Sequence, residues 1–152
     1  MAGPEFKLFK KYKAAFISEL GRSAQDTTAV NSIGRREFGS NWGGCHAQDK
    51  IKLGKNKYYV INTDFEKGPG EHWVALYTTK KKAYIYDSYG RPVEGLVGHL
   101  INTIKTHGFT LGPTNLDKHG EQIGYSSAVC AHCSLAFLCV VRDLGIAKAR
   151  DL

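Results

Sequence analysis

Long hydrophobic runs and an N-terminal secretion signal are both missing from this 152-residue chain. No apolar stretch reaches the roughly 18 residues that a membrane-spanning helix requires. No secretory leader stands at the N-terminus, and the chain has no internal repeat, low-complexity tract or linker. We therefore expect a protein that does not cross a membrane, and that works inside a cell or is packaged inside a particle.

Cysteines are few, and their grouping does not suit a disulfide framework, which spreads cysteines through loops. Cys130, Cys133 and Cys139 lie in one apolar segment, and Cys45 stands apart. The stretch from Cys130 to Cys133 has the spacing of half a zinc site, but the only second pair available is Cys45-His46. A redox pair should follow a strand of a thioredoxin-like unit, and that context is not evident. We therefore expect no metal.

Acidic residues are outnumbered by basic ones, 14 to 21, which gives a net charge of +7 and a pI near 9.2. This charge is typical of a solvated, soluble surface, or of a protein that attracts a polyanion, with nucleic acid first. Both interpretations stay open. The lysines form three clusters: Lys10, Lys11 and Lys13; Lys50, Lys52, Lys55 and Lys57; and Lys80, Lys81 and Lys82.

The chain length is typical of one domain, which we place at residues 7–152. Residues 1–6, MAGPEF, look like a remnant of an expression vector and are left out of the fold prediction. Apolar periodicity and turn residues predict the remaining elements. They are a helix over 7–20, turns and loops with short elements over 21–57, including WGGCHAQDKI, strands over 57–64, 72–77 and 83–87, a helix between Pro92 and Gly108, and a helix over 127–144. This order predicts an α+β fold with a small, mostly antiparallel sheet.

His72 stands at the head of an alternating apolar strand, in the stretch GEHWVALY. A short polar turn joins this strand to AYIYD, so the two strands should form a hairpin. Pairing Tyr77 with Lys82 places His72 directly opposite Asp87. Directly opposed residues lie on the same face of the sheet, with their Cβ atoms about 5 Å apart. Asp87 would then orient the imidazole and stabilise its protonated form. An ordinary cross-strand pair on the surface is the alternative.

Cys130 lies near the start of SSAVCAHCSLAFLCVV, the most apolar stretch of the chain. This stretch predicts a buried helix, and Ser126 or Ser127 can cap its N-terminus. Cys130 then falls in the first turn, where the helix dipole and unpaired N–H groups favour a thiolate. A histidine nearby would complete an activated nucleophile. A packing cysteine is the alternative.

An oxyanion donor is the third partner that such a pair requires. The backbone N–H of Cys130 is one donor, because the first N–H groups of a helix have no intrahelical acceptor. Gln122, on the loop that enters the helix, supplies a side-chain amide as the second. A solvated loop glutamine is the alternative for Gln122.

Taken in chain order, His72-Trp73, Asp87, Gln122 and Cys130 resemble the adenovirus-type cysteine proteases. These are viral maturation proteases whose wider clan includes the SUMO-deconjugating proteases. The segments GGCHAQDKI, YYVINTD, GEHWVALY and YIYDSYGRP look closest to the small proteases of virophages and Polinton-type elements. The resemblance covers about residues 42–143. Ala131 stands where the family usually has glycine, and the Gln-to-Cys spacing is longer by at least one residue.

The resemblance implies a role for each member of the constellation. Cys130 would be the nucleophile, His72 the general base and Asp87 its orienting acid. Gln122 would be the oxyanion donor, and Trp73 would pack beside the histidine and shape the site. The implied fold is adenain-like, with a small sheet packed against a buried central helix that carries the nucleophile.

The resemblance also implies a biological setting. The substrates would be viral capsid and other virion precursor proteins, cut during maturation in the virion or the infected host cell. DNA and a capsid-derived peptide would be activators, and we expect a monomer. Two alternatives remain: a ubiquitin- or SUMO-like deconjugating protease, and a non-catalytic, basic nucleic-acid-binding protein on the same fold.

Overall fold

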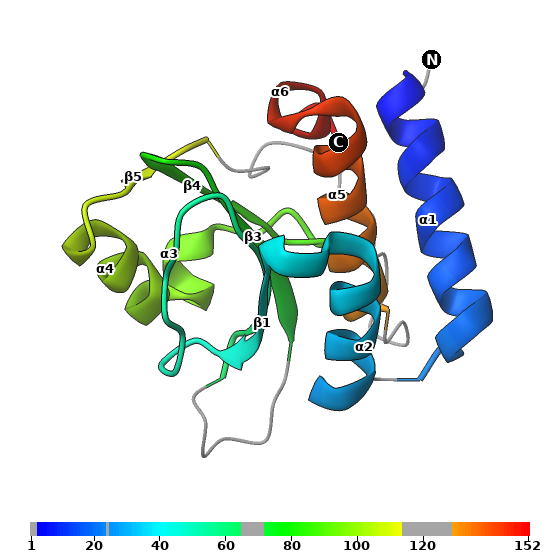
Figure 1. The fold of residues 1–152 in the computed structure, drawn as a ribbon, viewed down its shortest axis with the longest axis horizontal. Helices are drawn as coiled ribbons and strands as arrows, with labels where there is room; N and C mark the ends of the chain where they lie inside the picture. The colour runs from blue at the N-terminus through cyan, green and yellow to red at the C-terminus, as the bar shows by residue number, and fades with distance from the viewer. Residues whose placement is uncertain (1–2, 24, 65–71, 114–128) are drawn as a thin grey trace.

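The computed structural model describes residues 3–23, 25–64, 72–113 and 129–152, and these form a five-stranded sheet with helices on both faces (Figure 1). The strands are β1 (Trp42–Ala47), β2 (Tyr58–Asn62), β3 (Trp73–Thr78), β4 (Lys82–Tyr86) and β5 (Thr110–Leu111). The helices are α1 (Pro4–Leu20), α2 (Thr27–Phe38), α3 (Val93–Leu96), α4 (Gly98–Thr106), α5 (Cys130–Leu144) and α6 (Ile146–Ala149). The predicted α+β class is confirmed.

The sheet is mixed, with the strand order β1-β2-β3-β4-β5. The pairs β2–β3 and β3–β4 are antiparallel, whereas the outer pairs β1–β2 and β4–β5 are parallel. The prediction of a mostly antiparallel sheet therefore holds only for the three central strands. The stretch WGGCHAQDKI, named among the short elements of 21–57, forms strand β1 although it contains Gly43 and Gly44. A Cβ atom at Gly43 would lie 2.2 Å from the Tyr59 ring, so close packing requires the glycine.

Helix α2 takes up 12 residues of the segment predicted as turns and loops with short elements over 21–57, and this helix was not predicted. Asp26 caps the helix, since its side chain accepts a hydrogen bond of 2.8 Å from the backbone N–H of Ala29. Val30, Ile33 and Phe38 are buried on one face. The many Gly, Ser and Asn residues around this short apolar stripe concealed it in the sequence.

Helix α1 begins at Pro4, three residues earlier than predicted, so residues 4–6 belong to the fold. Proline suits the first turn of a helix, where its missing N–H has no acceptor to lose. Phe9 and Phe16 are buried in the same core cluster as the side chains of α5. The helix lies along α5 in Figure 1. It is therefore part of the packed core and not a separate docking helix.

Helix α5 lies between the sheet and α1, and the second face of the sheet carries α3 and α4 (Figure 1). Tyr86 of β4 stacks on Phe137 of α5 with ring centroids 4.3 Å apart. The predicted helix between Pro92 and Gly108 is present as α3 and α4, with a break at Val97. Among the described residues, no helix combines the length and apolar character needed to cross a bilayer.

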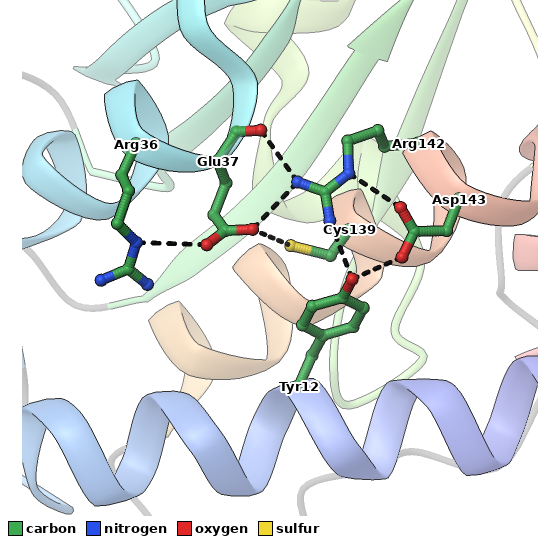
Figure 2. A network of polar contacts seen from close by, with 6 residues as sticks. All are labelled: Tyr12, Arg36, Glu37, Cys139, Arg142 and Asp143. Atoms are coloured by element: carbon green, nitrogen blue, oxygen red, sulfur yellow. Dashed lines mark hydrogen bonds and ion pairs between the residues drawn. The ribbon is translucent and has the colours of Figure 1, made fainter.

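The C-terminal half of α5 is tied to α1 and α2 by one guanidinium (Figure 2). Arg142 donates hydrogen bonds to the Glu37 carboxylate at 2.9 Å and to the Tyr12 hydroxyl at 2.8 Å. It also donates to Asp143 at 2.8 Å, and the Tyr12 hydroxyl donates to the same carboxylate. Three helices from distant parts of the chain therefore share one polar cluster, which fixes the position of α5.

Candidate active site

The β3–β4 hairpin forms as predicted, but its register differs by two residues. Thr78 pairs with Ala83 and Leu76 pairs with Ile85, whereas the sequence predicted Leu76 opposite Ala83. The hydroxyl of Thr79 accepts from the backbone N–H of Lys82 at 3.0 Å and closes a tighter turn. A shift of two residues keeps every side chain on its face, because the side-chain period of a strand is two.

Asp87 therefore still reaches His72, though not from the directly opposed position. His72 Nε2 lies 2.5 Å from Asp87 Oδ1. Both groups are buried, with Asp87 0% and His72 8% exposed. Burial lowers the pKa of His72, but the hydrogen bonds with Asp87 and Cys130 outweigh it and the pKa is raised. The contact is thus a buried pair that favours the protonated imidazole, and not the surface pair that the sequence left open.

Arg91 holds the second oxygen of the same carboxylate. Its backbone N–H donates to Asp87 Oδ2 at 2.9 Å, and its Nε donates to that oxygen at 3.1 Å. Burial raises the pKa of Asp87, but the bonds from His72 and Arg91 outweigh it and lower the pKa to about 2. Asp87 is therefore ionised throughout the neutral range, as an orienting carboxylate must be.

Cys130 is the first residue of α5, and its thiol is hydrogen-bonded to the His72 side chain. Burial raises the pKa of Cys130, but the bond to His72 and the charge of the imidazolium outweigh it and the pKa is lowered. Backbone N–H groups of Trp73 and Ala131 also bond the sulfur and lower the pKa. The position at the helix start agrees with the sequence prediction, and it favours the thiolate.

The three side chains form a chain of hydrogen bonds from Cys130 through His72 to Asp87. Since Nε2 of the imidazole faces Asp87, Nδ1 is the nitrogen left for the thiol. This arrangement can move a proton between the sulfur and the ring while the carboxylate holds the ring in place. Such geometry is that of an activated cysteine nucleophile.

Trp73 contributes to the site through its backbone. Its N–H bonds the sulfur of Cys130, and its carbonyl accepts a hydrogen bond of 3.3 Å from Ser134 of α5. The Trp73 side chain is half-buried against the core cluster that includes α5. Strand β3 and helix α5 are thereby held together beside Cys130.

Two predicted features depend on residues outside the described ranges, and the observed start of α5 decides one of them. Gln122, Ser126 and Ser127 lie within 114–128, so the oxyanion role of Gln122 stays a prediction. The serine cap does not hold, because the N-cap residue of α5 is Val129, without a side-chain cap hydrogen bond. The helix thus starts at Cys130, three residues later than predicted.

The histidines next to the cysteines considered above for a zinc site both bond backbone carbonyls. The His132 ring bonds the carbonyl of Gly21 at 2.8 Å, and the His46 ring bonds that of Gly43 at 3.0 Å. Within the described ranges, no three His, Cys, Asp or Glu side chains gather as a metal site requires. None of the four cysteines forms a disulfide.

Two residues beside the site were missed from the sequence. Tyr89 lies with its ring centroid 5.3 Å from that of His72, and the Arg91 guanidinium lies 4.7 Å above the Tyr89 ring. The i, i+4 spacing of Asp87 and Arg91 was the available indication. It carried little weight because the segment reads as a turn, where such pairs are usually solvated.

No model of a known protein family matches this chain, and a search of curated proteins finds no match either. The geometry of His72, Asp87 and Cys130 is therefore the basis for inferring what this site does. The resemblance to the adenovirus-type proteases stays a prediction.

Proposed function

We propose that this protein is a cysteine endopeptidase. The observation that carries the proposal is the chain of contacts Cys130–His72–Asp87, in which a buried His72–Asp87 pair meets a half-buried cysteine at the first position of a buried helix. A cysteine that only packs in the core requires no imidazole partner. A buried carboxylate that is only structural requires no histidine held in the protonated form of the imidazole. Together the three groups are matched to nucleophilic acyl transfer.

The reaction follows from the protonation states of these groups. The thiolate of Cys130 attacks the scissile carbonyl carbon, and the carbonyl oxygen becomes an oxyanion. The imidazolium of His72 then gives its proton to the leaving amine as the peptide bond breaks, which leaves an acyl-enzyme. Water, deprotonated by the neutral His72, hydrolyses the thioester and releases the thiol. Asp87 keeps the ring oriented throughout.

The oxyanion requires donors that are already in place. The backbone N–H of Cys130 is available, because the first N–H of a helix has no intrahelical acceptor. We propose the amide of Gln122 as the second donor.

As natural substrates we propose viral capsid and virion precursors, on the strength of the sequence resemblance. The net charge of +7 supports an encounter that DNA assists. Lys80, Lys81 and Lys82, at the exposed β3–β4 turn, are one part of that positive surface.

The test is a digest of a diverse peptide mixture, read by mass spectrometry. We expect wild-type protein to cut internal peptide bonds, and Cys130→Ala to lose about 10³-fold or more of the rate. Cys45→Ala is the matched control, because it removes a buried thiol away from the site and should keep the activity. Equal cleavage by wild type and Cys130→Ala would contradict the proposal. Cleavage confined to the bond after a diglycine would assign the deconjugating alternative instead.

The pH dependence of that activity follows from the two shifted groups. Activity should rise as pH increases through the lowered pKa of Cys130, because the thiolate forms there. It should fall as pH increases through the raised pKa of His72, because the imidazolium that protonates the leaving amine is lost. Asp87, with a pKa of about 2, adds no limb in this range. A rate profile that rises without falling up to pH 10 would contradict the imidazolium role.

A further inference from the structure

We propose that Arg91 is a positioning residue for the His72–Asp87 pair, and that it acts through the Asp87 carboxylate and the Tyr89 ring. This inference rests on the proposed function, since the pair it positions is the one assigned to catalysis. Nothing in the sequence resemblance gave Arg91 or Tyr89 a role.

Arg91 holds the Asp87 carboxylate at both of its oxygens. Arg91 reaches Asp87 Oδ2 through both its backbone N–H, at 2.9 Å, and its Nε, at 3.1 Å. Its Nη2 lies 3.4 Å from Oδ1, the oxygen that faces the imidazole at 2.5 Å. A carboxylate held at both oxygens cannot rotate about its Cβ–Cγ bond. Oδ1 therefore stays aimed at the ring.

A backbone turn brings Arg91 back to Asp87. The backbone N–H of Gly90 donates to the carbonyl of Asp87 at 2.9 Å, which closes a four-residue turn. Gly90 has φ of +69°, a conformation that other residues adopt with strain. Asp87 and the Arg91 side chain that binds it therefore belong to one local unit, residues 87–91.

The aromatic ring of Tyr89 connects Arg91 to His72. The guanidinium of Arg91 lies over the Tyr89 ring at 4.7 Å, and that ring lies 5.3 Å from the imidazole. Continuing the β3–β4 register beyond the strand ends brings Tyr89 level with His72. Arg91, Asp87, His72 and Tyr89 thus form a closed ring of contacts that restrains the imidazole plane.

The charge of Arg91 gives the arrangement a second consequence. Its side chain is 43% exposed, so burial of apolar surface does not explain its place. Among the described residues, the charged and titratable groups that face the imidazole are Asp87 and Tyr89 after β4 and Cys130 on α5, with Arg91 behind them. The guanidinium offsets part of the Asp87 charge, which keeps the imidazolium able to release its proton.

The test compares Arg91→Met and Arg91→Lys with wild type, with Arg150→Met as the control for loss of an exposed arginine. Two readouts are measured across pH: the NMR titration of the His72 ring and the alkylation rate of Cys130 by iodoacetamide. In Arg91→Met we expect the His72 titration to move to higher pH, because the Asp87 charge is no longer offset. A higher His72 pKa alone would favour the Cys130 thiolate, so the fall of about tenfold that we expect in alkylation at pH 6 reports the loss of the held carboxylate and imidazole plane. Arg91→Lys should restore the titration but not the rate, because an ammonium lacks the planar fork of a guanidinium.

The proposal is overturned if Arg91→Met matches wild type within twofold in both readouts, or if Arg91→Lys alkylates as fast as wild type. The second criterion applies even if Arg91→Met fails to fold. Neither readout requires peptide cleavage. A shifted His72 titration in an enzyme that cuts no peptide would support the positioning role and contradict only the endopeptidase assignment.

Discussion

At the scale of single residues, the thiols of this chain differ in what surrounds them. Burial raises the pKa of Cys45 and of Cys139 to about 12. Cys130 is half-buried, and burial raises its pKa too, but a cationic partner and backbone donors reverse the direction of its shift. Burial alone makes a thiol inert, and an adjacent imidazole makes it a nucleophile.

The first prediction at this scale concerns selective alkylation. With iodoacetamide at pH 6 to 7, Cys130 should react at least about tenfold faster than Cys45 and Cys139, because its pKa is lowered whereas burial raises the pKa of the other two thiols. Peptide mapping of the modified chain measures the three rates in one sample. His72→Ala should bring the rate of Cys130 down towards the others. Comparable rates at all three positions would show that no preformed thiolate exists.

At the scale of elements, helix α2 supports the sheet that carries His72 and Asp87. Asn31 of α2 accepts hydrogen bonds through Oδ1 from the Trp42 indole at 2.9 Å and from the backbone N–H of Cys45 at 3.1 Å. Trp42 also packs against Gly34, where an added Cβ atom would lie 2.1 Å from the indole. The close approach of α2 to β1 therefore depends on a glycine.

Gly34→Ala should lower the free energy of unfolding by about 1–3 kcal/mol, because overpacking outweighs the better helix propensity of alanine. Urea unfolding measures the change. Gly95→Ala is the matched control, since its added methyl group meets open space in another helix. It should leave stability unchanged or slightly raised. An equal effect of both substitutions would contradict the packing argument.

At the scale of the whole molecule, the two ends of α5 have separate tasks. Cys130 begins the helix at the candidate site, and Arg142 near its C-terminus joins α1 and α2 (Figure 2). The two residues lie about 18 Å apart along the helix axis. The polar cluster at Arg142 thus fixes the helix without touching the nucleophile.

Arg142→Met should destabilise the fold by about 1–3 kcal/mol, because Glu37 and Asp143 lose a charged hydrogen-bond partner. Thermal unfolding measures the loss, with Arg150→Met as the control. In the folded variant, the alkylation rate of Cys130 should remain within about twofold of wild type, because local perturbations weaken over such distances. A large drop in that rate at unchanged stability would show that the cluster acts on the site.

The sequence by itself indicated that His72, Asp87 and Cys130 come together, and it indicated most of the elements that carry them. Alternating aromatic and β-branched residues predicted β2, β3 and β4, and the apolar run after Cys130 predicted α5. The pairing of His72 with Asp87 could be inferred because side chains in a strand alternate with a period of two. That inference survived an error of two residues in register, since such an error leaves both residues on the same face.

Tertiary structure alone decided the features that depend on contacts between distant segments. Helix α2 packs through Gly34 against Trp42, and strand β1 packs through Gly43 against Tyr59. The Gly, Ser, Asn and Lys residues of this region indicated only turns and loops with short elements. The parallel pairing of β1 with β2 and the burial of Asp87 follow from chain packing, which no local pattern encodes. The role of Arg91 emerges only there, because a turn residue gains a partner when the fold buries the carboxylate beside it.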